Sequence, residues 1–343
     1  MKIAFLVPNF SKVDGGARAA EVHARELADE GNDVAIFALD ADIQPKNATL
    51  YVMGMPGNPF WRRVYRLIFP LDIVKTIRWL PKLKDFDTVI AYFYPLTWLG
   101  YLAKKFYRVN YTFWYVGLSE PQLYTHVHER IYIKLHRFFT RCTTRNVDRA
   151  VAISKYSQQE LKKNTGLDGE VVYSKVDTQK FHPGIDGAEI RRKYNLADDP
   201  VILFVGALHP GKGVHLLIQA FTLVKEKIPQ AKLVIGGRPD HPTYFAELKQ
   251  MSNDSVIFAG FVDDELLPLY YGMCDIYATG SLQENFNLPL VEAQRCGKPV
   301  VAFNLGSHPE VIDENGILVE PRNVEDFAQA IITIYNRQVN RIK

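Results

Sequence analysis

Short apolar runs alternate with helix-length amphipathic stretches from the first residues onward. Residues 2–7 are almost entirely apolar, which is typical of a short buried parallel strand. A loop carrying Gly15 and Gly16 comes next, and residues 17–30 then place apolar side chains at helical spacing. A second apolar run follows at residues 33–39. This order predicts a β-loop-α-β unit, the building block of a doubly wound sheet.

The same alternation continues along the chain and is interrupted once. Residues 176–184 carry turn residues without a clear period, which indicates a domain boundary there or slightly later. We therefore predict an α/β fold of two tandem Rossmann-like, doubly wound parallel-sheet domains facing a cleft, residues 1–180 and 181–343. A polar, basic tail is expected at residues 336–343. Further strands are predicted at residues 88–93, 109–116, 149–153, 170–173, 201–205, 232–235, 256–258, 275–278 and 299–303. Further helices are predicted at residues 155–163, 214–227, 243–251, 265–273, 288–296 and 324–335.

Two glutamates frame the start of one predicted helix. Pro289 suits a first helical turn, so Glu284 lies in the loop before the helix and Glu292 lies about one turn inside it. Free backbone N–H groups at the helix start form an anion site, but the helix dipole contributes only about 0.3–1 kcal/mol. A bound diphosphate would therefore need a cation as well. The residues at this helix start are Asn285, Phe286, Asn287 and Leu288.

Lys212 is the candidate cation. It lies in a glycine-rich loop, Gly206 to Gly213, that follows a predicted strand and precedes a helix. Glycines allow the backbone to approach a ligand closely, and a lysine there suits phosphate binding. Val214 follows Gly213, so the loop lacks the Ser or Thr of a Walker loop. Taken alone, such a loop is more often an ordinary strand–helix turn carrying a solvated lysine.

Together these segments resemble the family 4 glycosyltransferases of GT-B fold, over nearly the whole chain. Glu284 and Glu292 match the E-x7-E motif of that family, and Lys212-Gly213 match its phosphate loop. Gly15-Gly16 match its N-terminal loop, although the pair by itself is consistent with a flexible turn.

The resemblance implies a retaining hexosyltransferase that uses a nucleotide-sugar donor and needs neither metal nor cofactor. Glu284 would orient the donor sugar, Glu292 would hold the ribose, and Lys212 would neutralise the diphosphate. Gly15 and Gly16 would approach the sugar-phosphate from the other domain. The implied acceptor is a glycan or a lipid-linked molecule. The remaining expected donor contacts are Gly206, Arg238, Asn285, Phe286, Asn287 and Leu288.

Three departures from the family pattern leave other functions open. Ala207 stands where the family often has an arginine, and Arg238 could supply that charge. Asn287 replaces a glycine of the motif, and asparagine tolerates left-handed backbone better than most residues. The segment 115–118 lacks a histidine that the family often has there. A degenerate GT-B protein that binds nucleotide or scaffolds a partner enzyme is one alternative, and a sugar-nucleotide epimerase is another.

Composition narrows the partners and the compartment. The net charge of +3 is too small to indicate nucleic-acid binding. Three cysteines without a CxxC pair suggest a reducing compartment, so we expect a cytoplasmic protein. The basic and aromatic stretch 61–84 predicts peripheral contact with an anionic membrane, and solvated helix faces explain it equally well.

Overall fold

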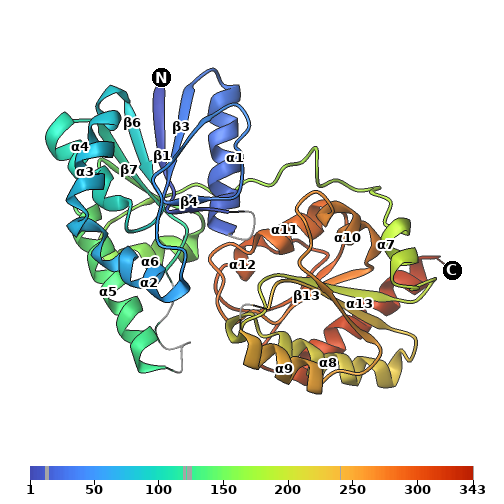
Figure 1. The fold of residues 1–343 in the computed structure, drawn as a ribbon. Coiled ribbons are helices and arrows are strands. Elements are labelled where there is room, and N and C mark those ends of the chain that lie inside the picture. The colour runs from blue at the N-terminus through green and yellow to red at the C-terminus, as the bar shows by residue number, and fades with distance from the viewer. Residues whose placement is uncertain (12–14, 119–120, 122–125, 240, 343) are drawn as a thin grey trace. The chain divides into compact units, whose positions relative to one another are not determined.

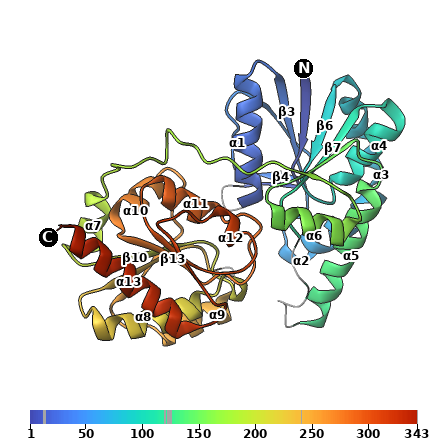
Figure 2. The ribbon, with the colours of Figure 1, turned by 180° about the vertical axis from the view of Figure 1, so that it is seen from behind.

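The computed structural model describes residues 1–11, 15–118, 121, 126–239 and 241–342. The chain divides into two compact units, Met1–Lys175 and Val176–Lys343. Figures 1 and 2 show them from opposite sides. Each unit is a parallel sheet with helices on both faces, as the alternation of apolar runs and helices predicts.

Unit 1 has a seven-stranded sheet in the order β5-β3-β1-β6-β7-β8-β9, and every pairing is parallel. Along β1, Ala4 and Leu6 join the core beneath α3 and α4, while Phe5 faces the opposite side and meets His23 of α1. The strands are β1 (Lys2–Leu6), β3 (Asp33–Ala38), β5 (Thr49–Val52), β6 (Thr88–Ala91), β7 (Asn110–Tyr115), β8 (Arg149–Ala152) and β9 (Glu170–Val171), with a small pair, β2 (Asn9–Phe10) and β4 (Asp40–Ala41). The helices are α1 (Gly15–Asp29), α2 (Pro59–Ile68), α3 (Ile73–Trp79), α4 (Thr97–Tyr107), α5 (Val127–Thr144) and α6 (Lys155–Thr165), with 3-10 turns η1 (Phe69–Leu71) and η2 (Leu80–Asp85).

Unit 2 has a six-stranded parallel sheet in the order β12-β11-β10-β13-β14-β15. Ile202 and Phe204 of β10 pack under α8 and α13, while Val201 and Leu203 pack under α10 and α11 on the other face. The strands are β10 (Val201–Val205), β11 (Lys232–Gly236), β12 (Val256–Gly260), β13 (Ile276–Thr279), β14 (Val300–Phe303) and β15 (Ile317–Val319). The helices are α7 (Ala188–Lys193), α8 (Val214–Lys227), α9 (Pro242–Gln250), α10 (Leu267–Met273), α11 (Leu288–Arg295), α12 (His308–Val311) and α13 (Val324–Ile342), with a 3-10 turn η4 (Pro210–Lys212).

The strand order of unit 2 reverses between β10 and β13. The loops that leave the carboxyl ends of two such neighbouring strands run in opposite directions, which opens a ligand site between them. One of these loops carries Lys212 and the other carries Glu284. The topology therefore brings the two main candidate residues to one edge of the sheet.

Two sequence predictions are wrong at helix ends. Gly15 and Gly16 lie in the first turn of α1 and not in a preceding loop. The first N–H groups of a helix have no partner inside it, so small flexible residues are tolerated there. The expected tail after residue 335 is helical as far as Ile342, since α13 continues and Gln338 donates to the Asp275 carbonyl at 3.0 Å. β5, β15, α7 and α12 are not predicted from the sequence, because they are short or weakly patterned.

Candidate functional site

The backbones of the loops after β10 and β13 touch each other. Leu282 N–H donates to the Gly211 carbonyl at 2.8 Å. Gly213 has φ +58°, and a Cβ there would lie 1.8 Å from the Gly280 oxygen. Any larger residue at position 213 would push the loops apart, so this glycine is needed to bring Lys212 to the second loop.

Lys212 and Glu284 form an ion pair across this junction. Lys212 Nζ donates to Glu284 Oε1 at 2.6 Å, and Ser281 Oγ donates to the same oxygen at 2.8 Å. Burial acts to raise the pKa of Glu284, but the Lys212 charge, the nearby His308 and the two hydrogen bonds outweigh it and lower the pKa. Glu284 is therefore a carboxylate at neutral pH, in a nearly enclosed position.

A third loop, after β14, fixes the backbone of Glu284. Ser307 N–H donates to the Glu284 carbonyl at 3.1 Å. Gly306 has φ +61°, and a Cβ there would lie 2.6 Å from the same carbonyl oxygen. Three consecutive strand ends of the sheet thus set the position of one carboxylate.

Asn287 starts α11 from a left-handed conformation, with φ 60° and ψ 65°, in line with its residue type. Its Oδ1 accepts from Leu290 N–H at 3.4 Å, which caps the helix. Its Nδ2 lies 2.8 Å from His308 Nε2, and His308 Nδ1 lies 2.8 Å from the Phe303 carbonyl. These partners assign the proton to Nδ1 of a neutral His308. The pKa of this ring is lowered, mainly by burial.

Glu292 lies inside α11 as predicted, but its side chain is buried. The Tyr271 hydroxyl donates to Glu292 Oε2 at 2.8 Å. Burial raises the pKa of the neighbouring Tyr277, and the charges of Glu284 and Glu292 raise it further, so both carboxylates lie around this ring. Ribose binding by Glu292 stays a prediction.

Most of the remaining expected donor residues lie in unit 2, and Gly15 and Gly16 lie in unit 1. In unit 2, Leu208 N–H donates to the Arg238 carbonyl at 3.0 Å, so the exposed Arg238 belongs to a loop that pairs with the Lys212 loop. Gly237 approaches the Gly206 oxygen so closely that a Cβ would lie 1.9 Å from it. Asn285 and Leu288 are half-buried and Phe286 is buried, all at the start of α11.

Gly15 and Gly16 lie in unit 1. A Cβ on Gly15 would meet no atom within 4 Å, so packing within unit 1 gives no reason for glycine at that position. Their neighbour in sequence, Asp14, lies outside the described residues.

Four residues of the site were not found from the sequence: Ser281, His308, Tyr271 and Tyr277. Ser281 and His308 act through Glu284 and Asn287, and no motif marks them. Within the described residues, no three His, Cys, Asp or Glu side chains form a metal-binding group.

Two family models match adjoining parts of the chain. The model described as Glycosyltransferase Family 4 matches residues 13–180, and the one described as Glycosyl transferases group 1 matches residues 186–342. The chain belongs to glycosyltransferase family 4. The site at β10 and β13 therefore lies in the part of this family 4 chain that matches the group 1 model.

Curated relatives of this family 4 chain include two mycobacterial enzymes. A GDP-mannose-dependent alpha-(1-6)-phosphatidylinositol monomannoside mannosyltransferase of Mycolicibacterium smegmatis is 28% identical over 257 residues, which are 69% of this chain and 64% of the relative. A D-inositol 3-phosphate glycosyltransferase of Mycobacteroides abscessus is 36% identical over 172 residues, 47% of this chain and 38% of the relative. The chain thus spans less than two thirds of the length of these relatives.

Solved structures share the fold. Sucrose-phosphate synthase of Thermosynechococcus elongatus has a TM-score of 0.81 at 20% identity, covering 98% of this chain and 90% of its own. Anabaena HepE in complex with UDP-glucose has a TM-score of 0.79 at 21% identity, again covering 98% and 90%. These neighbours establish the GT-B architecture of two Rossmann-like domains.

Proposed function

We propose that this protein is a retaining glycosyltransferase that moves a sugar from a nucleotide-sugar donor to a glycan or a lipid-linked acceptor. The observation that carries the proposal is the Lys212–Glu284 pair at the strand-order reversal of unit 2, beside the start of α11. An ammonium, a carboxylate and the positive end of a helix dipole suit a sugar diphosphate.

In this proposal donor binding rearranges the ion pair. Lys212 Nζ moves its hydrogen bonds to the diphosphate, and Glu284 accepts hydrogen bonds from hydroxyls of the donor sugar. The bond between the sugar and the diphosphate breaks and the acceptor oxygen bonds to the same sugar carbon. The proton of the acceptor hydroxyl passes to the departing phosphate oxygen, on which negative charge develops. Lys212 and the positive end of the α11 dipole stabilise that charge in the transition state. No metal is needed when these groups supply the positive charge.

The printed names of relatives support the donor and acceptor classes. The mycobacterial mannosyltransferase is GDP-mannose-dependent and acts on a phosphatidylinositol monomannoside, and Anabaena HepE was solved with UDP-glucose. By analogy we propose a nucleoside diphosphate donor, a cytoplasmic location and peripheral contact with an anionic membrane.

A second candidate function is nucleotide binding without catalysis, and unit 1 supplies the observation that favours it. Tyr115, in the segment where the family often has a histidine, is buried and accepts a hydrogen bond from Asn164 Nδ2 at 2.9 Å. The nearby His126 and His128 are exposed at the start of α5, where their rings stack 5.4 Å apart. None of these side chains is arranged as a catalytic base.

A panel of nucleotide sugars tests the proposal against this alternative. A donor at about 100 times its dissociation constant should stabilise the protein by roughly 2.7 kcal/mol in a thermal unfolding assay. The same donor should release nucleoside diphosphate slowly by hydrolysis. Lys212→Ala should lose both effects, whereas Lys227→Ala, an exposed lysine of α8, should keep them. Stabilisation without turnover on any donor and acceptor would favour the binding protein.

A further inference from the structure

Exposed apolar side chains concentrate on one segment of unit 1, from α2 through η1 to α3. Leu71, Ile73, Val74 and Ile77 are between 65% and 77% exposed. Among the described residues of unit 2, the exposed large apolar side chains are Met251, Phe261 and Leu266, and none of them is more than 47% exposed. Single exposed apolar residues are ordinary, but a cluster of this kind marks an interaction surface. The cluster also includes Phe60, Trp61 and Ile68.

Hydrogen bonds fix the turn between α2 and α3. Asp72 Oδ1 caps α3 by accepting from Lys75 N–H at 2.9 Å, and Asp72 Oδ2 accepts from the Tyr65 hydroxyl at 2.7 Å. Phe69 is fully buried in the core of unit 1, and Trp79 is nearly so. The outward position of Leu71 and Val74 is therefore part of a defined structure with anchors on either side.

The charge beside these apolar side chains is mostly basic, although Asp85 and Asp87 are exposed after Lys84 and Glu129 of α5 pairs with Arg63. Arg63, Arg78, Lys82 and Lys84 are exposed. The acid within the turn, Asp72, is already held by Tyr65 and Lys75, which with its helix-capping bond lower its pKa against the effect of burial.

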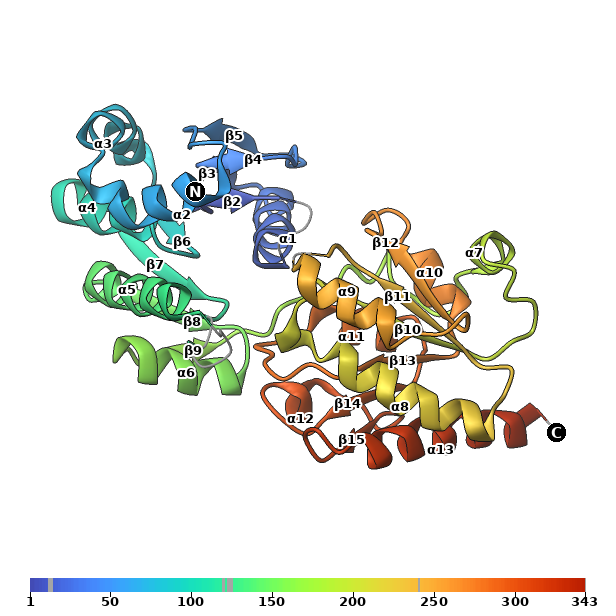
Figure 3. The same cartoon turned by 60° about the horizontal axis from the view of Figure 1, so that its bottom comes forward.

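Helix α5 extends the same surface. It lies beside α2, as Figures 1 and 3 show, and Arg63 Nη1 of α2 is 3.4 Å from Glu129 Oε1 of α5. Its exposed side chains repeat the combination of apolar and basic groups. They are Ile131, Leu135 and Phe138 together with Arg130, Lys134 and Arg141.

We propose that the surface formed by α2, η1, α3 and the exposed face of α5 docks on an anionic lipid bilayer. Leu71, Ile73 and Val74 enter the boundary between headgroups and acyl chains, and the arginines and lysines around them meet lipid phosphates. The excess of basic charge favours an anionic bilayer over a second copy, because two copies of this surface would set mostly like charges against each other. The structure describes no helix with both the length and the apolarity to cross a bilayer.

This surface makes specific the membrane contact proposed above and rests on that part of the proposal, but it uses none of the residues of the transfer reaction. Vesicle binding needs neither donor nor acceptor, and donor hydrolysis in solution needs no vesicle. A failure of one test is therefore distinguishable from a failure of the other.

Vesicle flotation with the full chain tests the surface. The protein should float with phosphatidylcholine vesicles that contain phosphatidylglycerol and stay unbound with phosphatidylcholine alone. Raising the salt from about 0.1 M to about 1 M shortens the Debye length from ~10 to ~3 Å and should weaken binding. Leu71→Ser with Val74→Ser should lower the affinity for anionic vesicles by about tenfold or more. The matched control, Phe261→Ser with Leu266→Ser, changes exposed apolar residues of unit 2 and should bind like the wild type.

Trp61 gives a second readout that a protein partner would not produce in pure lipid. Its side chain is 58% exposed, so its fluorescence should shift to the blue on anionic vesicles, and Trp61→Phe should lose the shift. Equal binding by the Leu71/Val74 variant and the wild type would overturn the proposal. So would a wild-type dimer in lipid-free sedimentation that the same variant converts to a monomer, since the surface would then join two copies.

Discussion

Both ends of the sheet in unit 2 carry a basic side chain paired with an acid. At the carboxyl end the pair is Lys212 and Glu284. At the amino end it is Arg191 of α7 and Asp275, which immediately precedes β13. The two pairs differ in how many of their hydrogen-bonding groups the protein itself satisfies.

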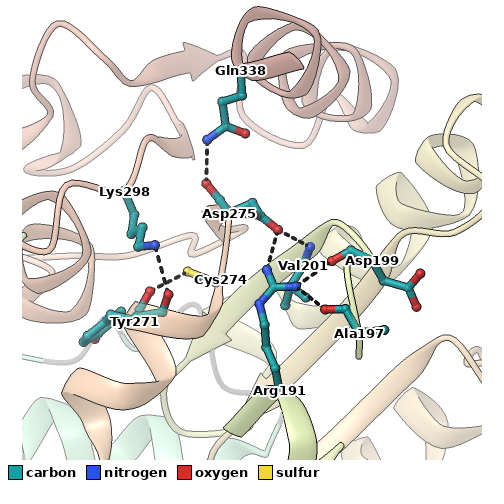
Figure 4. Close-up of polar contacts among 10 residues, drawn as sticks. Arg191, Ala197, Asp199, Val201, Tyr271, Cys274, Asp275, Lys298 and Gln338 are labelled. Carbon is teal, nitrogen blue, oxygen red and sulfur yellow. Dashed lines mark hydrogen bonds and ion pairs between the residues drawn. The ribbon is translucent and has the colours of Figure 1, made fainter. Parts of the chain in front are cut away.

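Figure 4 shows the several protein groups that bind the amino-end pair. Asp275 Oδ2 accepts from Arg191 Nη2 at 3.0 Å and from Val201 N–H at 2.8 Å. Arg191 Nη1 donates to the carbonyls of Ala197 and Asp199, each at 3.0 Å. Together with the bond from Gln338, this cluster joins α7, α13 and the first residues of two strands.

The carboxyl-end pair leaves donors over. An ammonium has three N–H groups, and within the described part of the chain Lys212 Nζ donates to Glu284 as its one acceptor. Glu284 is almost enclosed, while the Lys212 side chain is 26% exposed. Arg191 has three protein acceptors and its partner Asp275 also accepts from a backbone N–H, so this pair holds several segments together and stabilises the fold. Lys212 has one acceptor among the described residues and lies beside a helix start, which suits a ligand.

The largest expected effect separates the two ends by activity. Glu284→Gln removes the carboxylate that is proposed to orient the sugar, and its loss should lower the transfer or hydrolysis rate by about 10²–10³. The free energy of unfolding should change by less than about 1 kcal/mol, because Lys212 can be hydrated instead. Steady-state rates and urea unfolding measure the two quantities. A full rate in Glu284→Gln would make the carboxyl-end pair structural as well.

The second expected effect is at the amino-end pair, where a substitution should lower stability and leave donor binding unchanged. Asp275→Ala leaves Val201 N–H and Arg191 Nη2 without their Asp275 acceptor, which should cost roughly 1–3 kcal/mol of unfolding free energy. The stabilisation by a saturating donor, measured as a difference in Tm with and without ligand, should equal that of the wild type. Loss of donor binding in Asp275→Ala at a temperature where the protein is folded would contradict the division of roles.

The fold and the centre of the site could be predicted because their signals are local. Buried parallel strands are nearly continuous apolar runs, so β10 was predicted with its observed ends, and α8 likewise, from the spacing of its apolar residues. Glu284 and Lys212 belong to motifs of the family, so the sequence alone indicates them. The left-handed backbone of Asn287 could be expected, because this asparagine replaces a glycine of the motif and tolerates that conformation.

The partners of these residues could not be predicted because they are distant in sequence. Arg191 and Asp275 are 84 positions apart, and Asn287 and His308 are 21 apart. The steric need for Gly213 depends on the Gly280 oxygen of another loop. Contacts of this kind arise from strand order, and no pattern within one segment reports them.

The smallest expected effect is that of low pH, which should destabilise the carboxyl end of the unit 2 sheet before its amino end. His308 must be neutral to accept from Asn287, whereas the guanidinium of Arg191 keeps its charge at all ordinary pH values. Burial, with the charge of Lys212, lowers the pKa of His308 below its usual 6.5, against the opposing effects of Glu284 and the Phe303 carbonyl. Below about pH 6.5 the unfolded chain therefore binds a proton that the folded chain takes up only at lower pH. The stability from this group is full above about pH 6.5 and falls as the pH decreases. His23 and His136, whose pKa burial lowers to about 4, add to the same trend.

Donor affinity isolates the contribution of His308 from that of the other histidines. Protonation of Nε2 would place two donors face to face, turn the Asn287 side chain and remove the cap of α11, where the diphosphate is proposed to bind. The dissociation constant for donor should therefore rise between pH 7 and pH 5 in the wild type, by a factor of about 5 for each 1 kcal/mol of lost capping. His308→Gln should show weaker binding at pH 7 and a flatter dependence on pH, while His241→Gln, at an exposed position, should follow the wild type. Equal pH dependence in His308→Gln and the wild type would show that the start of α11 does not rely on this ring.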